Sequence, residues 1–429
     1  MSLFTNPVDR LQESLSKVFT PASPISQRER LKGREELLED IRRAYRREGS
    51  GVVLYGERGV GKTSVAKVAL NDLAGSHYYY SASATDTFES IVSSVLANYG
   101  AEWQERSKES LETTKKDAKL SIPVASGGLG HERQTKLVQQ RLGETHLSPQ
   151  EIANRLPKQE GLIIIDDFER IQSSDVRAQF ADLVKKLSDN HHPATVMLVG
   201  VADNIGDILS AHESARRNIM EVRVPRLTQS DIRRIVSDGV RQLQITIDDD
   251  SLEQIAEFSA QFPYYTHLLC EGAVTSLITR VRKGEQQDLH VAPANVRDAI
   301  LYAIRNTEYS ISHAYEEATR SITDSPRFKY TLYAIASWPK EPVSYRDIAK
   351  WVGGLVKVED LNVSHQLKRL ESAAIIERLS PGFYRFRNPI LKAFVMLKVR
   401  SDTPTVELAE IDAQLKQVQK RIDRVTQRI

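Results

Sequence analysis

The sequence predicts an α/β protein, with a parallel β-sheet first and mainly helical regions after it. Apolar runs of strand length alternate with amphipathic segments of helix length as far as residue 227. A glycine-rich loop separates the first apolar run from the helix that follows it. Beyond residue 228 the apolar runs give way to amphipathic segments with polar residues at their starts. This alternation is typical of a parallel sheet covered by helices on both faces, here followed by a helical region.

The expected elements follow in regular order. Strands are predicted at 51–55, 77–84, 162–165, 194–202 and 219–227. Helices between and after them are predicted at 63–73, 87–100, 175–189, 228–243, 249–260, 264–283 and 292–307. The helix after Thr228 has a variant of the capping box, because Thr228 is followed three residues later by Asp231.

The composition is that of a globular protein and excludes several other classes. The chain has 429 residues, enough for two or three domains, and its 40% hydrophobic and 27% charged residues are ordinary for a soluble globular protein. No apolar stretch approaches the ~18 residues of a membrane span, and the first ten residues lack a secretion signal, so we expect a cytoplasmic protein without a membrane partner. Cys270 is the single cysteine, which excludes an intrachain disulfide and a cysteine-based zinc site.

The loop after the first predicted strand has the spacing G-x-x-x-x-G-K-[ST]. It comprises Gly56, Glu57, Arg58, Gly59, Val60, Gly61, Lys62 and Thr63, with Ser64 directly after it. Glycines at this spacing allow consecutive backbone N–H groups to surround phosphate oxygens, and the N-terminus of the next helix faces the same anion. We therefore expect ATP as the ligand, with Lys62 on the β- and γ-phosphates and Thr63 on Mg²⁺.

A carboxylate for the metal follows the third predicted strand. Four apolar residues, 162–165, end at Asp166 and Asp167 in the segment GLIIIDDFERI. Ligands of parallel sheets bind at the carboxyl ends of the strands, so we assign Asp166 to Mg²⁺ and Asp167 to polarising the attacking water. Many ATPases with this type of phosphate loop have glutamate at the position of Asp167, which is one methylene shorter. Glu169 is therefore the alternative for polarising the attacking water.

These elements in this order resemble an AAA+ ATPase, in particular the origin-recognition and replication-initiator branch and the neighbouring STAND signalling ATPases. The resemblance covers roughly residues 18–310 and includes Gly33-Arg34-Glu35, which in this branch begins a helix beside the adenine. It implies that Asp203, after the fourth strand, senses the γ-phosphate. It also implies that Arg216 or Arg217 is an arginine finger acting on a neighbouring subunit of a homo-oligomer.

The same resemblance extends into the helical lid. Pro263 matches the proline of the lid's Gly-x-Pro motif and would contact the nucleotide, although Gln261 stands where glycine is usual and no sensor-2 arginine is evident. Between the second core helix and the Asp166 strand, residues 103–156 lengthen the connection and include a capped helix at 147–156. This insertion could contact DNA, a partner or the next subunit, or be a surface loop without such a role.

The C-terminal part has the pattern of a winged helix-turn-helix domain. Helices are predicted at 325–338, 344–352 and 358–376, with a hairpin over 375–388 that turns at Pro381-Gly382. Residues 325–400 contain 14 Lys/Arg and 6 Asp/Glu, a net charge of +8, which leaves −6 for the rest of the chain. Double-stranded DNA is therefore the expected partner, with protein contact as the alternative. The candidate DNA contacts are Ser364, His365, Lys368, Arg369, Arg385 and Arg387.

The end of the chain predicts a coiled-coil helix. Apolar residues recur at spacings of three and four from Leu408 to Ile429, an unbroken heptad seam. A helix of three heptads is marginal alone, so residues 406–429 need a partner. That partner could be a second copy, another protein, or the amphipathic N-terminus with Val8, Leu11, Leu15 and Val18.

We thus expect five regions. They are an amphipathic segment (1–20), an AAA+ core (21–227), a helical lid (228–322), a winged helix (323–400) and a heptad helix (401–429). The predicted function is an ATP-binding and hydrolysing switch that couples nucleotide state to oligomer assembly and DNA binding. Two alternatives are a STAND-like signalling ATPase whose C-terminal regions bind proteins, possibly in bacterial defence, and a nucleotide-binding scaffold with little turnover.

Overall fold

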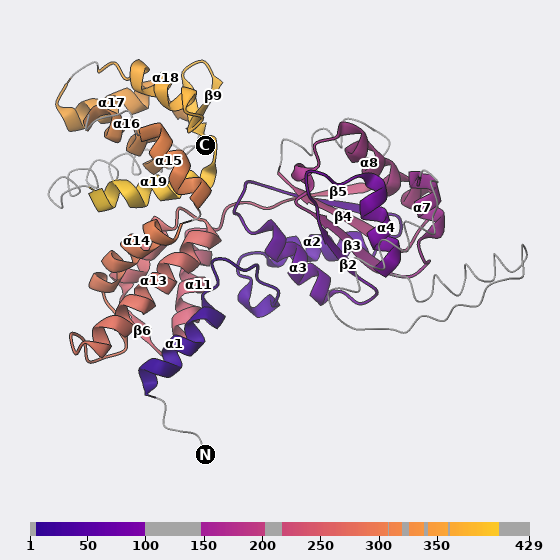
Figure 1. The fold of residues 1–429 in the computed structure, drawn as a ribbon, viewed down its shortest axis with the longest axis horizontal. Helices are drawn as coiled ribbons and strands as arrows, with labels where there is room; N and C mark the ends of the chain where they lie inside the picture. The colour runs from indigo at the N-terminus through magenta and orange to yellow at the C-terminus, as the bar shows by residue number, and fades with distance from the viewer. Residues whose placement is uncertain are drawn as a thin grey trace, which may run out of the picture. The chain divides into compact units, whose positions relative to one another are not determined.

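A computed structural model describes residues 6–98, 147–201, 217–307, 309–319, 326–338, 342–358 and 361–402. The chain divides into two compact units (Figure 1). The core unit comprises residues 24–57 and 61–225, and the helical unit comprises residues 1–23, 58–60 and 226–429. Among the described helices, none combines the length and the apolar character that crossing a lipid bilayer requires.

The core unit is built on a five-stranded parallel sheet in the order β2-β3-β4-β1-β5. Its strands are β1 (Gly51–Tyr55), β2 (Tyr78–Ser81), β3 (Gly161–Asp166), β4 (Ala194–Gly200) and β5 (Ile219–Arg223). Its helices are α2 (Glu35–Tyr45), α3 (Lys62–Asp72), α4 (Phe88–Asn98), α7 (Pro149–Arg155) and α8 (Ser174–Asp189), with short 3-10 turns at η1 (Arg28–Arg30) and η2 (Phe168–Arg170). The predicted parallel α/β sheet is confirmed, although β2, β4 and β5 end earlier than the expected strands.

Helices cover both faces of this sheet, which explains why its central strands are continuously apolar. Helices α2 and α3 pack against one face, while α4, α7 and α8 form the layer on the other. Within β3, Ile163 and Ile165 belong to the core formed with α4, α7 and α8. Because side chains alternate along a strand, Leu162, Ile164 and Asp166 lie on the face of α2 and α3. Asp166 is therefore on the same side of the sheet as the helix that follows the glycine-rich loop.

The helical unit begins with α1 (Pro7–Val18) and continues with four further helices. These are α11 (Gln229–Gln242), α12 (Asp249–Phe258), α13 (Pro263–Arg282) and α14 (Pro293–Asn306). The capping box predicted at Thr228 and Asp231 is present, with the Thr228 hydroxyl accepting the Asp231 N–H at 3.1 Å. Two short parallel strands, β6 (Thr246–Ile247) and β7 (His290–Val291), were not expected from the sequence.

The apolar face of α1 is buried against α13. Val8, Leu11, Leu15 and Val18 are each no more than 7% exposed. Phe19, which follows α1, lies directly against Gly239 of α11, where a Cβ atom would collide with its ring. The suggestion that this face pairs with the C-terminal heptads is therefore wrong, because the helical unit already occupies it. The heptads themselves lie outside the described residues.

The rest of the helical unit combines helices with a small antiparallel sheet. The helices are α15 (Tyr309–Thr319), α16 (Pro326–Ser337), α17 (Tyr345–Val356), α18 (Ser364–Ser372) and α19 (Pro389–Asp402). The strands β8 (Val343–Ser344), β9 (Ile376–Ser380) and β10 (Phe383–Phe386) pair in the order β8-β10-β9. The third predicted helix is shorter than expected, and α19, which packs against α14, α15 and α16, was not predicted.

Candidate nucleotide-binding site

The loop between β1 and α3 has the backbone of a phosphate cradle. Gly59 and Gly61 have φ values of +81° and +94°, a region that residues with a Cβ atom rarely adopt. Gly61 is the N-cap of α3 and, being glycine, has no side chain to cap the first N–H groups of this helix. The first N–H groups of a helix are the donors that an anion at its N-terminus accepts from. The positions of the glycines thus follow from the backbone conformation that the loop needs.

Lys62 lies at the start of α3 and folds back over the loop. Its Nζ atom donates to the carbonyl oxygens of Gly56 at 3.2 Å and Glu57 at 2.9 Å. The ammonium charge is thereby held against the first half of the cradle. Thr63 follows directly, and Ser64 accepts the N–H of Ile25 at 3.1 Å through its hydroxyl. The Ser64 hydroxyl therefore holds the segment around Ile25 against α3.

The segment before α2 is tied to the core unit at several points. Asn71 donates to the carbonyl of Ser26 at 2.9 Å, and Arg28 pairs with Asp72 at 2.6 Å. Arg34, in the Gly-Arg-Glu sequence, is only 3% exposed and donates to the carbonyl of Pro225 at 2.6 Å. The segment therefore runs along α3, and Arg34 links it to the chain just beyond β5.

At the carboxyl end of β3, both oxygens of Asp166 accept hydrogen bonds. Oδ1 accepts the N–H of Asp167 at 2.8 Å, and Oδ2 accepts the hydroxyl of Tyr79 at 2.7 Å. Asp166 is 2% exposed. Burial, together with the hydrogen bond to Asp166 and the charges of Asp166 and Asp167, raises the pKa of Tyr79 above its ordinary value, so this phenol remains a donor.

The two other carboxylates near this edge point in opposite directions along the sheet. Asp167 has a left-handed backbone (φ 54°), and its Oδ2 accepts the hydroxyl of Ser81 on β2 at 2.8 Å. Glu169 lies beside β4 instead, since a Cβ atom added to Gly200 would be 3.1 Å from its Oε2. Because β4 separates β3 from β1, Glu169 is on the side of the phosphate loop and Asp167 is on the far side.

The oxygen groups of this edge suit a magnesium ion. Thr63 and Asp166 offer a hydroxyl and a carboxylate, hard oxygen ligands of the kind that Mg²⁺ prefers. In the part of the chain that the structure describes, no group of three or more His, Cys, Asp or Glu side chains forms a metal site. Mg²⁺ in nucleotide sites is usually held by one or two protein ligands and completed by phosphate oxygens and water.

The remaining predicted site residues lie either outside the described residues or away from the β1–α3 loop in the sequence. Asp203, Arg216 and most of the 103–156 insertion lie outside the described residues, whereas the capped helix expected in 147–156 is present as α7. Arg217 is exposed in the turn before β5. Pro263 is the first residue of α13, and Gln261 just before it has a φ of +68°. That left-handed conformation explains why glycine is usual at the position of Gln261.

Sequence reasoning missed three residues of the site, namely Tyr79, Ser81 and Lys67. Tyr79 pairs in register with Ile164, so Tyr79 and Ser81 lie on the same face of the sheet as Asp166. Lys67, one turn after Thr63 on α3, places Nζ 5.0 Å from the centre of the Tyr79 ring. The alternation along β2 was visible in the sequence, but the pairing of β2 with β3 was not.

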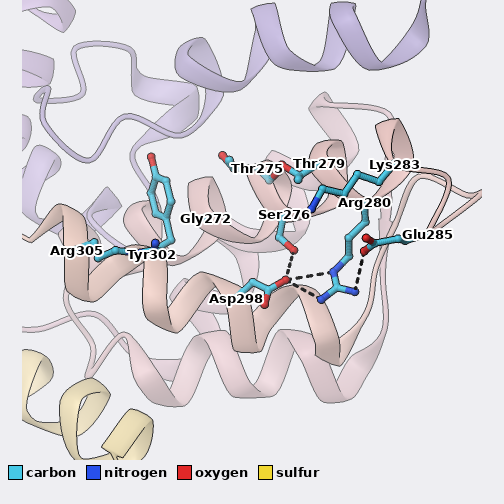
Figure 2. Close-up of a pocket in the computed structure, with 10 residues that line it drawn as sticks. All are labelled: Gly272, Thr275, Ser276, Thr279, Arg280, Lys283, Glu285, Asp298, Tyr302 and Arg305. Atoms are coloured by element: carbon cyan, nitrogen blue, oxygen red, sulfur yellow. Dashed lines mark hydrogen bonds and ion pairs between the residues drawn. The ribbon is translucent and has the colours of Figure 1, made fainter.

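The helical unit contains a polar cavity of about 250 Å³ between α13 and α14 (Figure 2). Arg280, one of the cationic residues that line it, donates to Asp298 through Nε at 3.1 Å and Nη2 at 2.9 Å. Asp298 also accepts the Ser276 hydroxyl at 2.7 Å, and buried Asn295 donates to Ser276 at 3.2 Å. These residues form a network that joins two helices.

The candidate DNA contacts occupy α18 and the β9–β10 hairpin. His365 and Lys368 are exposed on α18, whereas Arg369 is partly buried and Ser364 lies 3.3 Å from the hydroxyl of Tyr345. On the hairpin, Arg387 is exposed, but Arg385 forms an ion pair with Glu377 across the two strands. Part of the charge of Arg385 is therefore balanced within the protein.

The model of the AAA ATPase domain family matches residues 30–199. This part of the chain is similar to AAA ATPase domains. The match spans the phosphate loop, β3 and β4, and together with the parallel sheet it supports a P-loop AAA+ ATPase. No curated protein matches the chain.

Several solved structures are similar over most of their length. A Walker-type ATPase of Pyrococcus abyssi is 16% identical, with a TM-score of 0.49, and the match covers 87% of this chain and 98% of that one. The ORC2 protein of Aeropyrum pernix, solved as ADPNP–ADP complexes, is 16% identical with a TM-score of 0.46, over 93% and 98% of the two chains. Similarity this distant carries no inference about function, which must come from the site.

Proposed function

We propose that this protein binds ATP with Mg²⁺ and hydrolyses it at the edge of the sheet formed by the β1–α3 loop and the end of β3. One observation carries the proposal: Gly61 and Lys62, at the N-terminus of α3, belong to the same unit and the same sheet face as the buried Asp166. A nucleoside triphosphate site needs N–H and cationic donors around the phosphates, and it needs an oxygen ligand for the metal.

The residues divide the work by their chemistry. Lys62 supplies charge and donors to the β- and γ-phosphates, while Thr63 and Asp166 supply oxygen ligands to the metal. When bound, Mg²⁺ would neutralise charge on the phosphates and favour attack by water. Arg216 or Arg217 would act on the nucleotide of a neighbouring copy, so hydrolysis should rise on assembly of a homo-oligomer. This trans role rests on the resemblance to AAA+ ATPases.

Replacing Lys62 by alanine tests the nucleotide site directly. ATP affinity, measured by calorimetry or with a fluorescent analogue, should fall at least about a hundredfold because charge-assisted contacts to the phosphates are lost. Lys185→Ala is the matched control, since Lys185 lies on α8 at the opposite face of the sheet. Unchanged ATP affinity in a folded Lys62→Ala protein would exclude the proposed site.

Two carboxylates compete for the role of polarising water. Asp167 follows the metal ligand directly but is held by Ser81 on β2, whereas Glu169 lies beside Gly200 on the side of the phosphate loop. Asp167→Asn and Glu169→Gln, each with ATP binding retained, separate them: the variant that loses hydrolysis identifies the residue. If neither variant changes a slow basal rate, the low-turnover scaffold becomes the better description.

For the C-terminal part we propose a winged helix that binds double-stranded DNA. The order α16, β8, α17, α18, β9, β10 is that of three helices and a hairpin wing, and residues 325–400 have a net charge of +8. Exposed His365 and Lys368 on α18 would face the groove. We further propose that nucleotide state controls assembly and DNA binding together.

The alternative is a STAND-like signalling ATPase whose winged helix contacts protein. Leu379 and Phe383 on the hairpin are 47% and 42% exposed, which favours an apolar partner at the wing. Residues 406–429 would then supply a second contact through their heptads.

Salt dependence of DNA binding distinguishes the two. With the whole protein and ATP, the logarithm of the affinity should fall by roughly one unit per log unit of salt for each phosphate neutralised. Lys368→Ala with Arg369→Ala should flatten this slope by up to about two units for every sequence. Absence of salt-dependent binding at low ionic strength would favour the protein-contact function.

A further inference from the structure

Tyr79 occupies a distinctive place beside the expected metal ligand. Its hydroxyl donates to Oδ2 of Asp166 at 2.7 Å, while the N–H of Asp167 donates to Oδ1 at 2.8 Å. With one donor on each oxygen, the carboxylate has little freedom to rotate about its Cβ–Cγ bond. Each oxygen keeps lone-pair capacity, because a carboxylate can accept about four hydrogen bonds or metal contacts in total.

The Tyr79 ring is itself held in place from α3. Lys67 lies 5.0 Å from the ring centre and one helical turn after Thr63. A cation over an aromatic face is favourable and restricts the ring. Two residues one turn apart on α3 therefore serve the two sides of the proposed metal site: Thr63 as a ligand, and Lys67 as a support for the tyrosine that holds the other ligand.

We propose that Tyr79 is a positioning residue that fixes the orientation of Asp166 for Mg²⁺, with Lys67 holding the Tyr79 ring. The proposal rests on the proposed nucleotide site and adds to it a residue outside the phosphate loop and the Asp-Asp sequence. Groups that orient metal ligands through hydrogen bonds commonly change metal affinity by 10–100-fold when they are removed. Tyr79 should therefore affect how much Mg²⁺ the protein needs, and leave nucleotide contacts made without metal intact.

Tyr79→Phe removes only the hydroxyl and keeps the ring under Lys67. The chain offers a matched control in the adjacent residue: Tyr80 also interacts electrostatically with an aspartate, Asp86, but faces the α4 side of the sheet. Tyr80→Phe thus removes a tyrosine hydroxyl near an aspartate, on the same strand but away from the site.

The experiment measures affinity for a fluorescent ATP analogue in EDTA and through a Mg²⁺ titration, using the whole protein. Tyr79→Phe should leave the affinity in EDTA within twofold of the original protein and raise the half-saturating Mg²⁺ concentration about tenfold. Tyr80→Phe should leave both values unchanged. Lys67→Met, which keeps the hydroxyl, should give a smaller shift of about threefold in the same direction.

The outcomes separate this inference from the proposed function. If the original protein binds nucleotide and Lys62→Ala does not, but neither Tyr79→Phe nor Lys67→Met shifts the Mg²⁺ midpoint beyond twofold, the positioning role is wrong and the site stands. An equal shift in Tyr80→Phe also overturns it, because the effect would then come from the packing of β2. If Mg²⁺ does not alter nucleotide binding in the original protein, both proposals fail. Should Tyr79→Phe not fold, Lys67→Met decides the matter by the same measurement.

Discussion

Two aspartates of this protein, Asp166 in the core unit and Asp298 in the helical unit, accept several hydrogen bonds each, but from different kinds of donor. Asp166 is bound by the neutral hydroxyl of Tyr79 and a backbone N–H, so its negative charge is not balanced by these contacts. Asp298 is bound by the guanidinium of Arg280 and by Ser276 (Figure 2). Neutral donors orient a carboxylate and keep its charge for a cation, whereas a cationic donor uses that charge to join two helices.

The comparison predicts that changing Asp166 removes function and changing Asp298 removes stability. Asp166→Ala should lower Mg²⁺-dependent ATP hydrolysis by at least about a hundredfold, because the proposed metal ligand would be lost. The melting temperature without nucleotide should change little, because relief of a buried charge offsets the loss of the acceptor for Tyr79 and the Asp167 N–H. A variant that still hydrolyses ATP at the original rate would place the metal elsewhere.

Asp298→Ala should have the opposite profile. It leaves Arg280 and Ser276 without their shared acceptor, and we expect the free energy of unfolding to fall by about 1–2 kcal/mol, the lower end being favoured by the partial exposure of this pair. Urea unfolding measures this change, and hydrolysis per folded molecule should stay constant. Loss of nucleotide binding at constant stability would assign a functional role to the cavity between α13 and α14.

Acid should weaken the network of Asp298 selectively. Burial alone would raise the pKa of Asp298, but hydrogen bonds from Ser276 and Arg280 and the charges of Arg280 and Arg297 outweigh it and lower that pKa below its ordinary value. A lowered folded-state pKa gives stability that is present above the unfolded pKa, about 3.9, and is lost as pH falls below it. The stability difference between the original protein and Asp298→Asn should therefore shrink between pH 5 and pH 3. A difference that is constant over this range would mean that charge contributes little.

Ser81→Ala should have the smallest effect on Mg²⁺ binding. It tests whether the neutral donor to Asp167 matters for the metal as the donor to Asp166 is proposed to. Ser81 holds Asp167, which is not assigned to the metal, so the Mg²⁺ midpoint should stay within about twofold of the original value. A tenfold shift would show that the magnesium site depends on Asp167 as well as Asp166.

Features that depend on local backbone geometry were predictable from sequence. The left-handed glycines at 59 and 61, the apolar strand before Asp166 and the capping box at Thr228 each follow from residues close together in the chain. In each case the residue type has few alternatives: glycine for a positive φ, a hydroxyl for an orphan N–H, a continuous apolar run for a strand buried on both faces.

Contacts between distant segments were not predictable in this way. The charge count predicted a DNA contact at Arg385 but did not reveal its ion pair with Glu377. The heptad spacing suggested that the C-terminal helix could pair with α1, whose apolar face is covered by α13. Periodicity shows that a face must be covered, but many segments could satisfy the same pattern. α19 was missed because nothing in the preceding pattern required a further helix after the hairpin.

The sequence by itself determined a phosphate loop, a strand-end carboxylate and the parallel α/β class, because each depends on residue types at fixed short spacing. Only the tertiary structure decided which strands are neighbours. The order β2-β3-β4-β1 places Tyr79 and Ser81 on the carboxylates of β3, and it places Gly200 and Glu169 on the side of the phosphate loop. Strand order depends on how apolar faces pack across the whole core, and that free energy is distributed over many residues that are far apart in the chain.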